Sequence, residues 1–373
     1  MESASDGETD TQINILEMRF HVLAESWTPS DSEITMQPPL EQPEVQFALG
    51  AVREAAQLAR RVQQEMISPA LAKQDRSPVT VADFAAQLIV ARLLAERFPE
   101  AFLVGEESAR MLRASDGRET LEQIMRIVQT WLPETTPESV CDWIDRGAGD
   151  PPAAYWTLDP VDGTKGFLRG DQYAVALAYV ENGQVQLGVL GCPELLEASR
   201  PSKGASGCLV LAVRGAGTFT QPLDPMAQSP DAVAEWRPLR VSERRDVAVA
   251  RLLCSVEKAH TDPDGIGALV SALKIQADPV PLDSQAKYAL LAAGVGDVNL
   301  RLLSPARPDY REKVWDQAAG SIVVEEAGGR VSDLEGKPLD FSRGRTLAAN
   351  RGVLATNGYL HESILAGLKQ IGA

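Results

Sequence analysis

The chain has 373 residues, which is too many for one ordinary hydrophobic core, so two packed lobes are expected. Its net charge of −16 argues against binding to nucleic-acid polymers or anionic membranes, because a surface of that sign repels both. A small phosphorylated ligand is compatible with this charge where metal ions or clustered Lys and Arg reverse the sign locally.

Residues 1–45 are polar, acidic and proline-containing, and they are predicted to form a loosely ordered extension. They have neither the apolar region of a secretory signal nor the composition of a transit peptide, which favours the cytosol. No apolar run approaches the roughly 18 residues that a membrane-spanning helix needs. The cysteines are expected to be reduced thiols, because none lies in a CxxC pair: Cys141, Cys192, Cys208 and Cys254.

Helical periodicity marks the segment that follows the extension. Apolar residues recur at the 3.6-residue period over 43–68, and a second helix is expected over 82–97. A short strand is predicted at 101–104 and a helix at 119–131. An irregular connection is then expected as far as about residue 152.

The remaining elements mix strands and helices without strict βαβ alternation. A strand is predicted at 155–158, and 173–180 and 184–190 form a predicted hairpin around the favoured turn pair Asn182-Gly183. Two later helices are predicted at residues 284–293 and 315–327. This mixture favours an α+β fold of stacked layers.

Two carboxylates stand three residues apart directly after a predicted strand, in Asp159-Pro-Val-Asp-Gly-Thr164. Pro160 stiffens the turn and Gly163 lets the backbone bend sharply, so both side chains and the Val161 carbonyl can point to one place. Hard oxygen ligands of this kind suit Mg²⁺. Taken alone, the segment could equally be an Asp-rich surface turn.

Two further acidic segments favour a metal site. Gly105-Glu106-Glu107-Ser108 also follows a predicted strand, and Asp316 stands at the predicted start of a helix. Helix capping is an alternative explanation for Asp316, although a helix start followed by small residues also suits phosphate. Three carboxylate segments in such turns together predict a metal-dependent site.

Other catalytic chemistries find little support in the sequence. A histidine-rich zinc or iron site is not expected, because the chain has only His21, His260 and His361. The chain also lacks the GxSxG elbow of many serine hydrolases and the GxxxxGK[ST] loop of P-loop enzymes.

These motifs resemble the lithium-sensitive, magnesium-dependent phosphatase superfamily that includes inositol monophosphatase. Segments 159–164, 105–107 and 315–320 carry the resemblance. Four further segments are similar to the 3′(2′),5′-bisphosphate nucleotidase branch of that superfamily: 77–87, 162–170, 256–260 and 283–288. The resemblance extends from about residue 46 to the C-terminus.

The resemblance implies a layered αβαβα sandwich of the sugar-phosphatase type, an α+β fold with two lobes and the active site between them. The lobe at 46–240 would carry most metal ligands, and the lobe at 241–373 would carry Asp316 and the nucleotide contacts. The implied reaction is hydrolysis of the 3′-phosphate of adenosine 3′,5′-bisphosphate to AMP, with 3′-phosphoadenosine 5′-phosphosulfate as a further substrate. The implied cofactor is Mg²⁺, as two or three ions. The partner would be this small nucleotide bisphosphate, and the chain a monomer.

The resemblance also implies roles for matching positions. The Mg²⁺ ligands would be Glu106, Asp159, Asp162 and Asp316 with the Val161 carbonyl. The attacking water would be activated by Asp83 and Thr164. The substrate contacts would be Thr164, His260, Ser284, Lys287, Arg301 and Asp316.

Two alternative functions stay open. An inositol polyphosphate 1-phosphatase would share the metal motifs, although segment 283–288 favours a nucleotide. A non-catalytic, metal-dependent nucleotide sensor would use the same pocket without turnover. The presence of Asp83, Thr164 and all the metal carboxylates argues against that second alternative.

Overall fold

A computed structural model describes most of the chain beyond its N-terminal segment. The described residues are 37–66, 78–115, 117–224, 235–255, 262–304, 307 and 309–373. Most of the extension predicted for residues 1–45 lies outside these ranges.

Two long helices form the first layer, α2 (Pro43–Met66) and α3 (Pro78–Arg97). They cover one face of a seven-stranded sheet of order β1-β2-β3-β4-β7-β8-β9. Its strands are β1 (Leu103–Gly105), β2 (Ala154–Asp162), β3 (Ala174–Glu181), β4 (Gln184–Cys192), β7 (Cys208–Val213), β8 (Gly217–Pro222) and β9 (Arg237–Leu239). The predicted β3–β4 hairpin is confirmed, with positive φ at both Asn182 and Gly183 as the tight turn requires.

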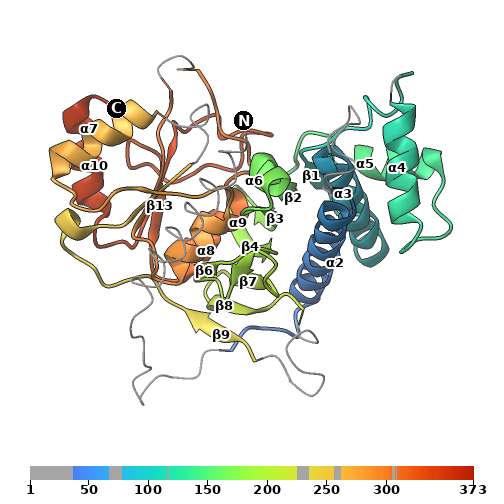
Figure 1. Cartoon of the computed structure of the whole chain (residues 1–373), viewed down its shortest axis with the longest axis horizontal. Helices are drawn as coiled ribbons and strands as arrows, with labels where there is room; N and C mark the ends of the chain where they lie inside the picture. The colour runs from blue at the N-terminus through green and yellow to red at the C-terminus, as the bar shows by residue number, and fades with distance from the viewer. Residues whose placement is uncertain are drawn as a thin grey trace, which may run out of the picture.

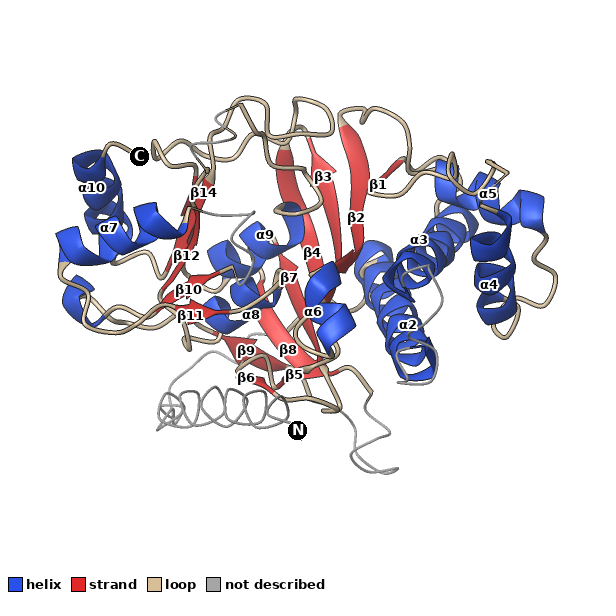
Figure 2. Cartoon of the chain, turned by 45° about the horizontal axis from the view of Figure 1, so that its top comes forward, coloured by secondary structure: helices blue, strands red, loops and turns tan. Residues whose placement is uncertain are grey.

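The middle layer contains α8 (Ala286–Ala292) and α9 (Ala318–Glu326), which lie between the two sheets (Figures 1 and 2). The second sheet has five strands in the order β11-β10-β12-β14-β13. Its strands are β10 (Leu252–Cys254), β11 (Val280–Pro281), β12 (Val298–Arg301), β13 (Arg330–Ser332) and β14 (Val353–Thr356). The outer helices α7 (Pro263–Leu273) and α10 (His361–Ile371) cover its other face. The five layers confirm the predicted αβαβα sandwich.

Strand β3 shows how one sheet serves two hydrophobic cores. Val175 and Leu177 pack with apolar residues of α2 and α3, whereas Ala174 and Ala176 belong to the core that includes α8 and α9. Successive side chains of a strand point to opposite faces, so the two cores are built from alternate residues. The proposed lobe boundary near residue 240 falls between β9 and β10.

The connection between β1 and β2 differs from the prediction. It contains α4 (Arg118–Val128), which was expected, and also α5 (Pro137–Asp145), which was not. Thr136 and Ser139 form a reciprocal capping box around Pro137 at the first turn of α5. The irregular connection was a wrong prediction, because proline breaks a helix interior but favours its first position.

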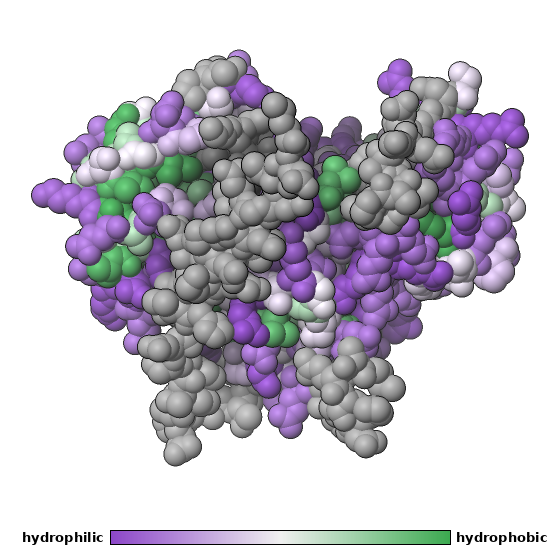
Figure 3. All heavy atoms as spheres, viewed as in Figure 1, coloured by the Kyte–Doolittle hydropathy of each residue, from purple (hydrophilic) through white to green (hydrophobic). Residues whose placement is uncertain are grey.

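The remaining elements are short. Helix α6 (Thr164–Arg169) follows β2 directly, and β5 (Leu195–Leu196) pairs with β6 (Arg200–Pro201) as a separate ribbon. None of the helices in the described ranges is long and apolar enough to cross a membrane. Among the described residues on the face seen in Figure 3, most are polar, and apolar spheres gather over α7 and α10.

Candidate active site

A pocket of about 530 Å³ opens where the two halves of the fold meet. One part of its wall comes from the ends of β1 and β2 and from the start of α6. The other part comes from the segment leading into α8, from β12 and from the residues that precede α9. Its size is typical of small-molecule sites in proteins.

Parallel pairing of β1 and β2 brings Glu106 beside Asp159. Gly105 lies opposite Leu158 in the register, so Glu106, which follows β1, lies beside Asp159, the next residue along β2. The side chains of Glu106 and Asp159 are close enough for each carboxylate to change the pKa of the other. A short buried strand and a parallel register therefore place two carboxylates together that are far apart in sequence.

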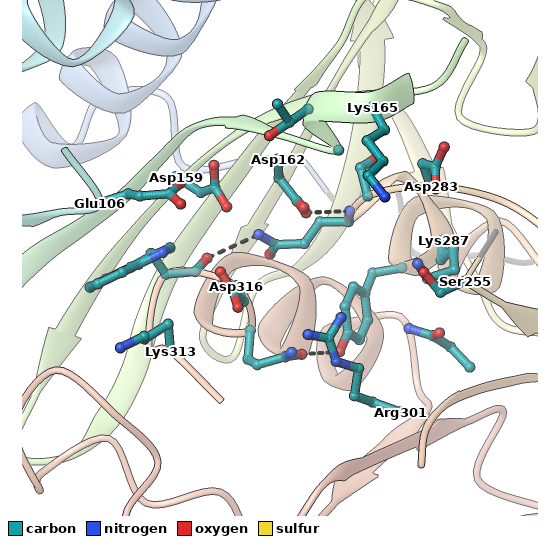
Figure 4. A pocket seen from close by; sticks show the side chains of 18 of the residues that line it. Glu106, Asp159, Asp162, Lys165, Ser255, Asp283, Lys287, Arg301, Lys313 and Asp316 are labelled. Atoms are coloured by element: carbon teal, nitrogen blue, oxygen red, sulfur yellow. Dashed lines mark hydrogen bonds between the residues drawn. The ribbon is translucent and has the colours of Figure 1, made fainter. Parts of the chain in front are cut away.

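A β-bulge explains how Asp162 joins them. Asp159 pairs with Ala176 and Asp162 with Ala174, so three steps along β2 correspond to two steps along β3. Without the extra residue, side chains three positions apart would point to opposite faces. Figure 4 shows both aspartates directed into the pocket, with Glu106 on one side and Asp316 below them.

Asp316 reaches the pocket from the segment that precedes α9. The helix begins at Ala318 rather than at residue 315, and Gln317 occupies the N-cap position without a side-chain capping bond. The capping explanation for Asp316 is therefore wrong. Its carboxylate instead faces the other acids, and burial, Glu312 and Asp162 raise its pKa well above the usual range.

The acidic wall, defined here as Glu106, Asp159, Asp162 and Asp316, is compensated only in part by nearby cations. Asp159 is 3% exposed, and its Oδ1 has no hydrogen-bond partner among the described residues. Burial raises the pKa of Asp159 far above its usual value, and the other three acids of the wall and Asp83 raise it further. Buried anionic oxygens in this state call for a compensating cation.

The donor set fits Mg²⁺, which prefers hard oxygen ligands. In the described part of the chain, no three acidic, histidine or cysteine side chains are already arranged to grip one ion. The fit consequently rests on the oxygen-only donors and on the unpartnered oxygen of Asp159. Val161, whose carbonyl was predicted as a ligand, also lines the pocket.

Opposite the acids lies a cationic wall, defined here as Lys287 and Arg301 (Figure 4). Arg301 Nε donates to Glu312 Oε1 at 3.1 Å, and Glu312 also accepts from Gln317 at 2.9 Å. Lys287 Nζ donates to the Leu282 carbonyl at 3.1 Å, and burial lowers the pKa of this ammonium. Two cations opposite four carboxylates suit a ligand with more than one phosphate.

The turn after β2 and the segment before α8 approach each other closely between the two walls. Gly163 has φ +91°, and a Cβ there would lie 2.9 Å from Ser284 Cβ. Ser284 itself lines the pocket, and its Oγ accepts a hydrogen bond from the Ala286 amide at 3.2 Å. The next residue, Gln285, donates its backbone N–H to Asp162 Oδ2 at 2.6 Å.

Gln285 is a functional residue that sequence reasoning missed. Its side chain donates to the Trp315 carbonyl at 2.9 Å and accepts from the Gly320 amide at 2.9 Å. It thus ties the Asp162 turn to the segment that carries Asp316. The available signal was its position inside segment 283–288, which was read only for substrate contacts.

The predicted water-activating pair is not joined directly in the structure. Thr164 begins α6 and lines the pocket, whereas Asp83 is buried in α3. No hydrogen bond connects them among the described residues, and Asp83 Oδ1 has no partner there. Burial, then Glu107 and Glu106, raise the pKa of Asp83 well above its usual value, and burial raises that of Glu107 to about 7.

The histidines contribute little to the described pocket. His260, predicted to contact substrate, lies outside the described residues, so its role stays a prediction. His361 is fully buried in α10, where its ring nitrogens bond to the hydroxyls of Ser332 and Thr356 at 2.9 and 3.0 Å. That histidine belongs to the packing of the outer layer.

The chain is similar in sequence to a known protein family over most of its length. Residues 41–373 match the model of the inositol monophosphatase family. A 3′(2′),5′-bisphosphate nucleotidase of Emericella nidulans is 38% identical over 346 residues, covering 86% of this chain and 96% of that protein. A protein of the same name from Oryza sativa is 40% identical over 346 residues, covering 87% and 93%.

Solved structures agree on the fold. An IMPase of Thermotoga maritima superposes with a TM-score of 0.58 at 20% identity, covering 89% of this chain and 98% of that one. An inositol monophosphatase of Staphylococcus aureus gives a TM-score of 0.57 at 17% identity, covering 88% and 94%. At this level of identity the likeness concerns the fold alone.

Proposed function

Because the chain belongs to the inositol monophosphatase family, we propose that it is a Mg²⁺-dependent phosphatase that removes the 3′-phosphate from adenosine 3′,5′-bisphosphate. The products are AMP and inorganic phosphate. The observation that carries this proposal is the pocket itself, in which four carboxylates, one of them buried with an unpartnered oxygen, face Lys287 and Arg301. The names of relatives that are 38–40% identical over most of the chain favour the nucleotide over an inositol phosphate.

The proposed metal ligands are the four carboxylates of the acidic wall with the Val161 carbonyl. Bound Mg²⁺ supplies Lewis-acid chemistry, lowering the pKa of water and neutralising charge on phosphate oxygens. A net charge of −16 makes that neutralisation necessary before a bisphosphate can enter the pocket. We propose two or three ions for this pocket.

The other proposed roles concern protons and orientation. Thr164 orients the attacking water through its hydroxyl, and Asp83 accepts the proton, a task that its raised pKa suits. Lys287 and Arg301 hold the second phosphate, so the ester to be cleaved lies at the acidic wall. Asp316 and Ser284 border the same space, and His260 is proposed as a further contact.

A phosphate-release panel tests the function. The purified chain is assayed with adenosine 3′,5′-bisphosphate, 3′-phosphoadenosine 5′-phosphosulfate and inositol 1,4-bisphosphate, each with Mg²⁺, with Mg²⁺ plus Li⁺, and with EDTA. The expected result is Mg²⁺-dependent, Li⁺-inhibited release, with the highest kcat/KM on the two nucleotides.

The same panel separates the alternatives. A higher kcat/KM on the inositol ester would replace the nucleotidase by an inositol phosphatase. Binding of the nucleotide without product after prolonged incubation would identify a sensor. Undiminished release in EDTA would end the metal-dependent proposal. The expectations of a monomer and of a cytosolic location stay predictions.

A further inference from the structure

Arg345 reaches across the fold to the strand end that carries Glu106. Its Nη1 donates to the carbonyl oxygens of Gly147 at 2.8 Å and Gly149 at 3.0 Å, and its Nη2 donates to the carbonyl of Gly105. Gly105 is the last residue of β1 and is bonded directly to Glu106. One planar guanidinium therefore fixes the backbone from which this carboxylate projects.

The same guanidinium also contacts the segment that carries Asp316. Its Cζ lies 4.9 Å from the centre of the Trp315 ring, an arrangement typical of a cation–π interaction. The Val314 amide donates to the Arg345 carbonyl at 3.2 Å, so the backbones are joined as well. Arg345 thus lies between the residues that immediately precede two acids of the pocket.

Asp150 interacts electrostatically with Arg345, but not as a direct ion pair. In the described part of the chain, no carboxylate lies within ion-pair distance of its guanidinium, and its directional contacts go to backbone carbonyls and an aromatic ring. A fork of donors holding three carbonyls is specific to arginine, since a lysine ammonium is a single point charge on a flexible stem.

We propose that Arg345 is a positioning residue that sets the separation between Glu106 and Asp316 and thereby the affinity of the pocket for Mg²⁺. The proposal rests on the function proposed above, because it assumes that these two carboxylates hold Mg²⁺. Residues that orient metal ligands without touching the ion commonly change metal affinity by about 10- to 100-fold.

The test compares Arg345→Lys with Arg343→Lys. Arg343 is two residues away, is exposed and pairs with Asp340, so it controls for loss of a guanidinium in the same loop. Thermal unfolding is followed over a Mg²⁺ titration without substrate, and phosphate release is measured over the same titration at saturating nucleotide. For Arg345→Lys we expect the half-saturating Mg²⁺ concentration to rise about tenfold by both readouts.

The nucleotide KM at saturating Mg²⁺ should change far less than the Mg²⁺ requirement, and Arg343→Lys should match the wild type throughout. A lower Tm in Arg345→Lys with an unchanged Mg²⁺ midpoint would overturn the proposal, because it would show that Arg345 stabilises the fold without affecting Mg²⁺ binding. The thermal titration needs no turnover. A wild type that binds Mg²⁺ but releases no phosphate would therefore contradict the proposed function while leaving this inference measurable.

Discussion

Asp297 and Asp159 are both almost completely buried, with exposed fractions of 0% and 3%, yet their surroundings differ. Asp297, the residue before β12, accepts hydrogen bonds from Ser242 Oγ, from Arg244 Nε at 3.1 Å, and from the backbone and side chain of Arg251 at 2.8–2.9 Å. Asp159 faces other carboxylates and has an oxygen without a partner among the described residues.

The difference separates a structural carboxylate from a functional one. A buried charge whose lone pairs are filled by protein donors holds the fold together and has no capacity left for a ligand. A buried charge surrounded by like charges destabilises the fold until something positive arrives. Burial alone would not have distinguished the two residues, whereas the hydrogen-bond partners of each oxygen do.

The largest expected effect is the loss of catalysis in Asp159→Asn. The amide cannot replace an anionic ligand, so kcat/KM should fall by about 10³-fold or more. Without Mg²⁺ the variant should be at least as stable as the wild type, because a repelled buried charge has been removed. Activity assays and urea unfolding in EDTA measure the two effects. A variant that is both inactive and unstable in EDTA would contradict the comparison.

Asp297→Asn should give the opposite pattern. It leaves Arg244 and Arg251 without their carboxylate, so the free energy of unfolding should fall by about 3–5 kcal/mol. At temperatures where the variant is folded, kcat and the Mg²⁺ requirement should stay near wild-type values. Asp264→Asn, a change at an exposed residue in the first turn of α7, is the matched control and should alter neither.

Glu312 is a useful third case, because it is a buried carboxylate with hydrogen-bond donors on both oxygens and it lies beside the pocket. It is 2% exposed and holds both Arg301 and Gln317. In Glu312→Gln, an amide cannot serve both donors, so Arg301 loses its fixed orientation. The nucleotide KM should rise about 30-fold. The half-saturating Mg²⁺ concentration should rise much less, although Glu312 adds negative potential at Asp316.

The control for that experiment is Glu335→Gln, which removes an exposed ion pair with Lys337 and should leave KM unaltered. Steady-state kinetics over both nucleotide and Mg²⁺ would separate the effects. If the Mg²⁺ requirement of Glu312→Gln rose more than its nucleotide KM, Glu312 would act mainly on the acidic wall and not on Arg301.

The sequence could predict most of the acidic wall because its placement is local. Asp159 and Glu106 each follow an apolar run in the sequence, and the parallel register of β1 and β2 places them side by side. The bulge that directs Asp162 to the same face was not predicted, although Pro160 and Gly163 indicated an unusual turn. Helix α5 was missed because its proline was taken as a breaker rather than as a first-turn residue.

The supporting residues could not be predicted, because their positions depend on contacts between distant segments. Arg345 is separated from Gly105 by 240 positions and belongs to no motif, so nothing local indicated its contacts. Gln285 lay within a recognised segment, but its bonds to Trp315 and Gly320 arise only when α8 packs beside α9. The sequence motifs therefore predicted the proposed metal ligands better than the residues that hold those ligands in position.

The smallest expected effect concerns His361. This residue extends the comparison of buried carboxylates to a buried side chain that is neutral. Its ring is fully buried and is bonded to two hydroxyls, and burial lowers its pKa from 6.5 to about 4. Between these values the unfolded chain binds a proton that the folded chain does not, so stability falls as the pH falls from 6.5 towards 4. We expect a loss of roughly 2 kcal/mol between pH 7 and pH 5 from this residue.

Urea unfolding of the wild type and His361→Gln at pH 7 and pH 5 isolates that contribution, because the carboxylates titrate equally in both. The amide keeps a donor and an acceptor for Ser332 and Thr356, so the variant should lose less stability than the wild type on acidification. The pH dependence of kcat should be the same in both, since this histidine packs in the outer layer. An equal loss of stability in the two proteins would mean that His361 is protonated in the folded state. A buried side chain whose hydrogen bonds are all satisfied would then not identify a structural residue.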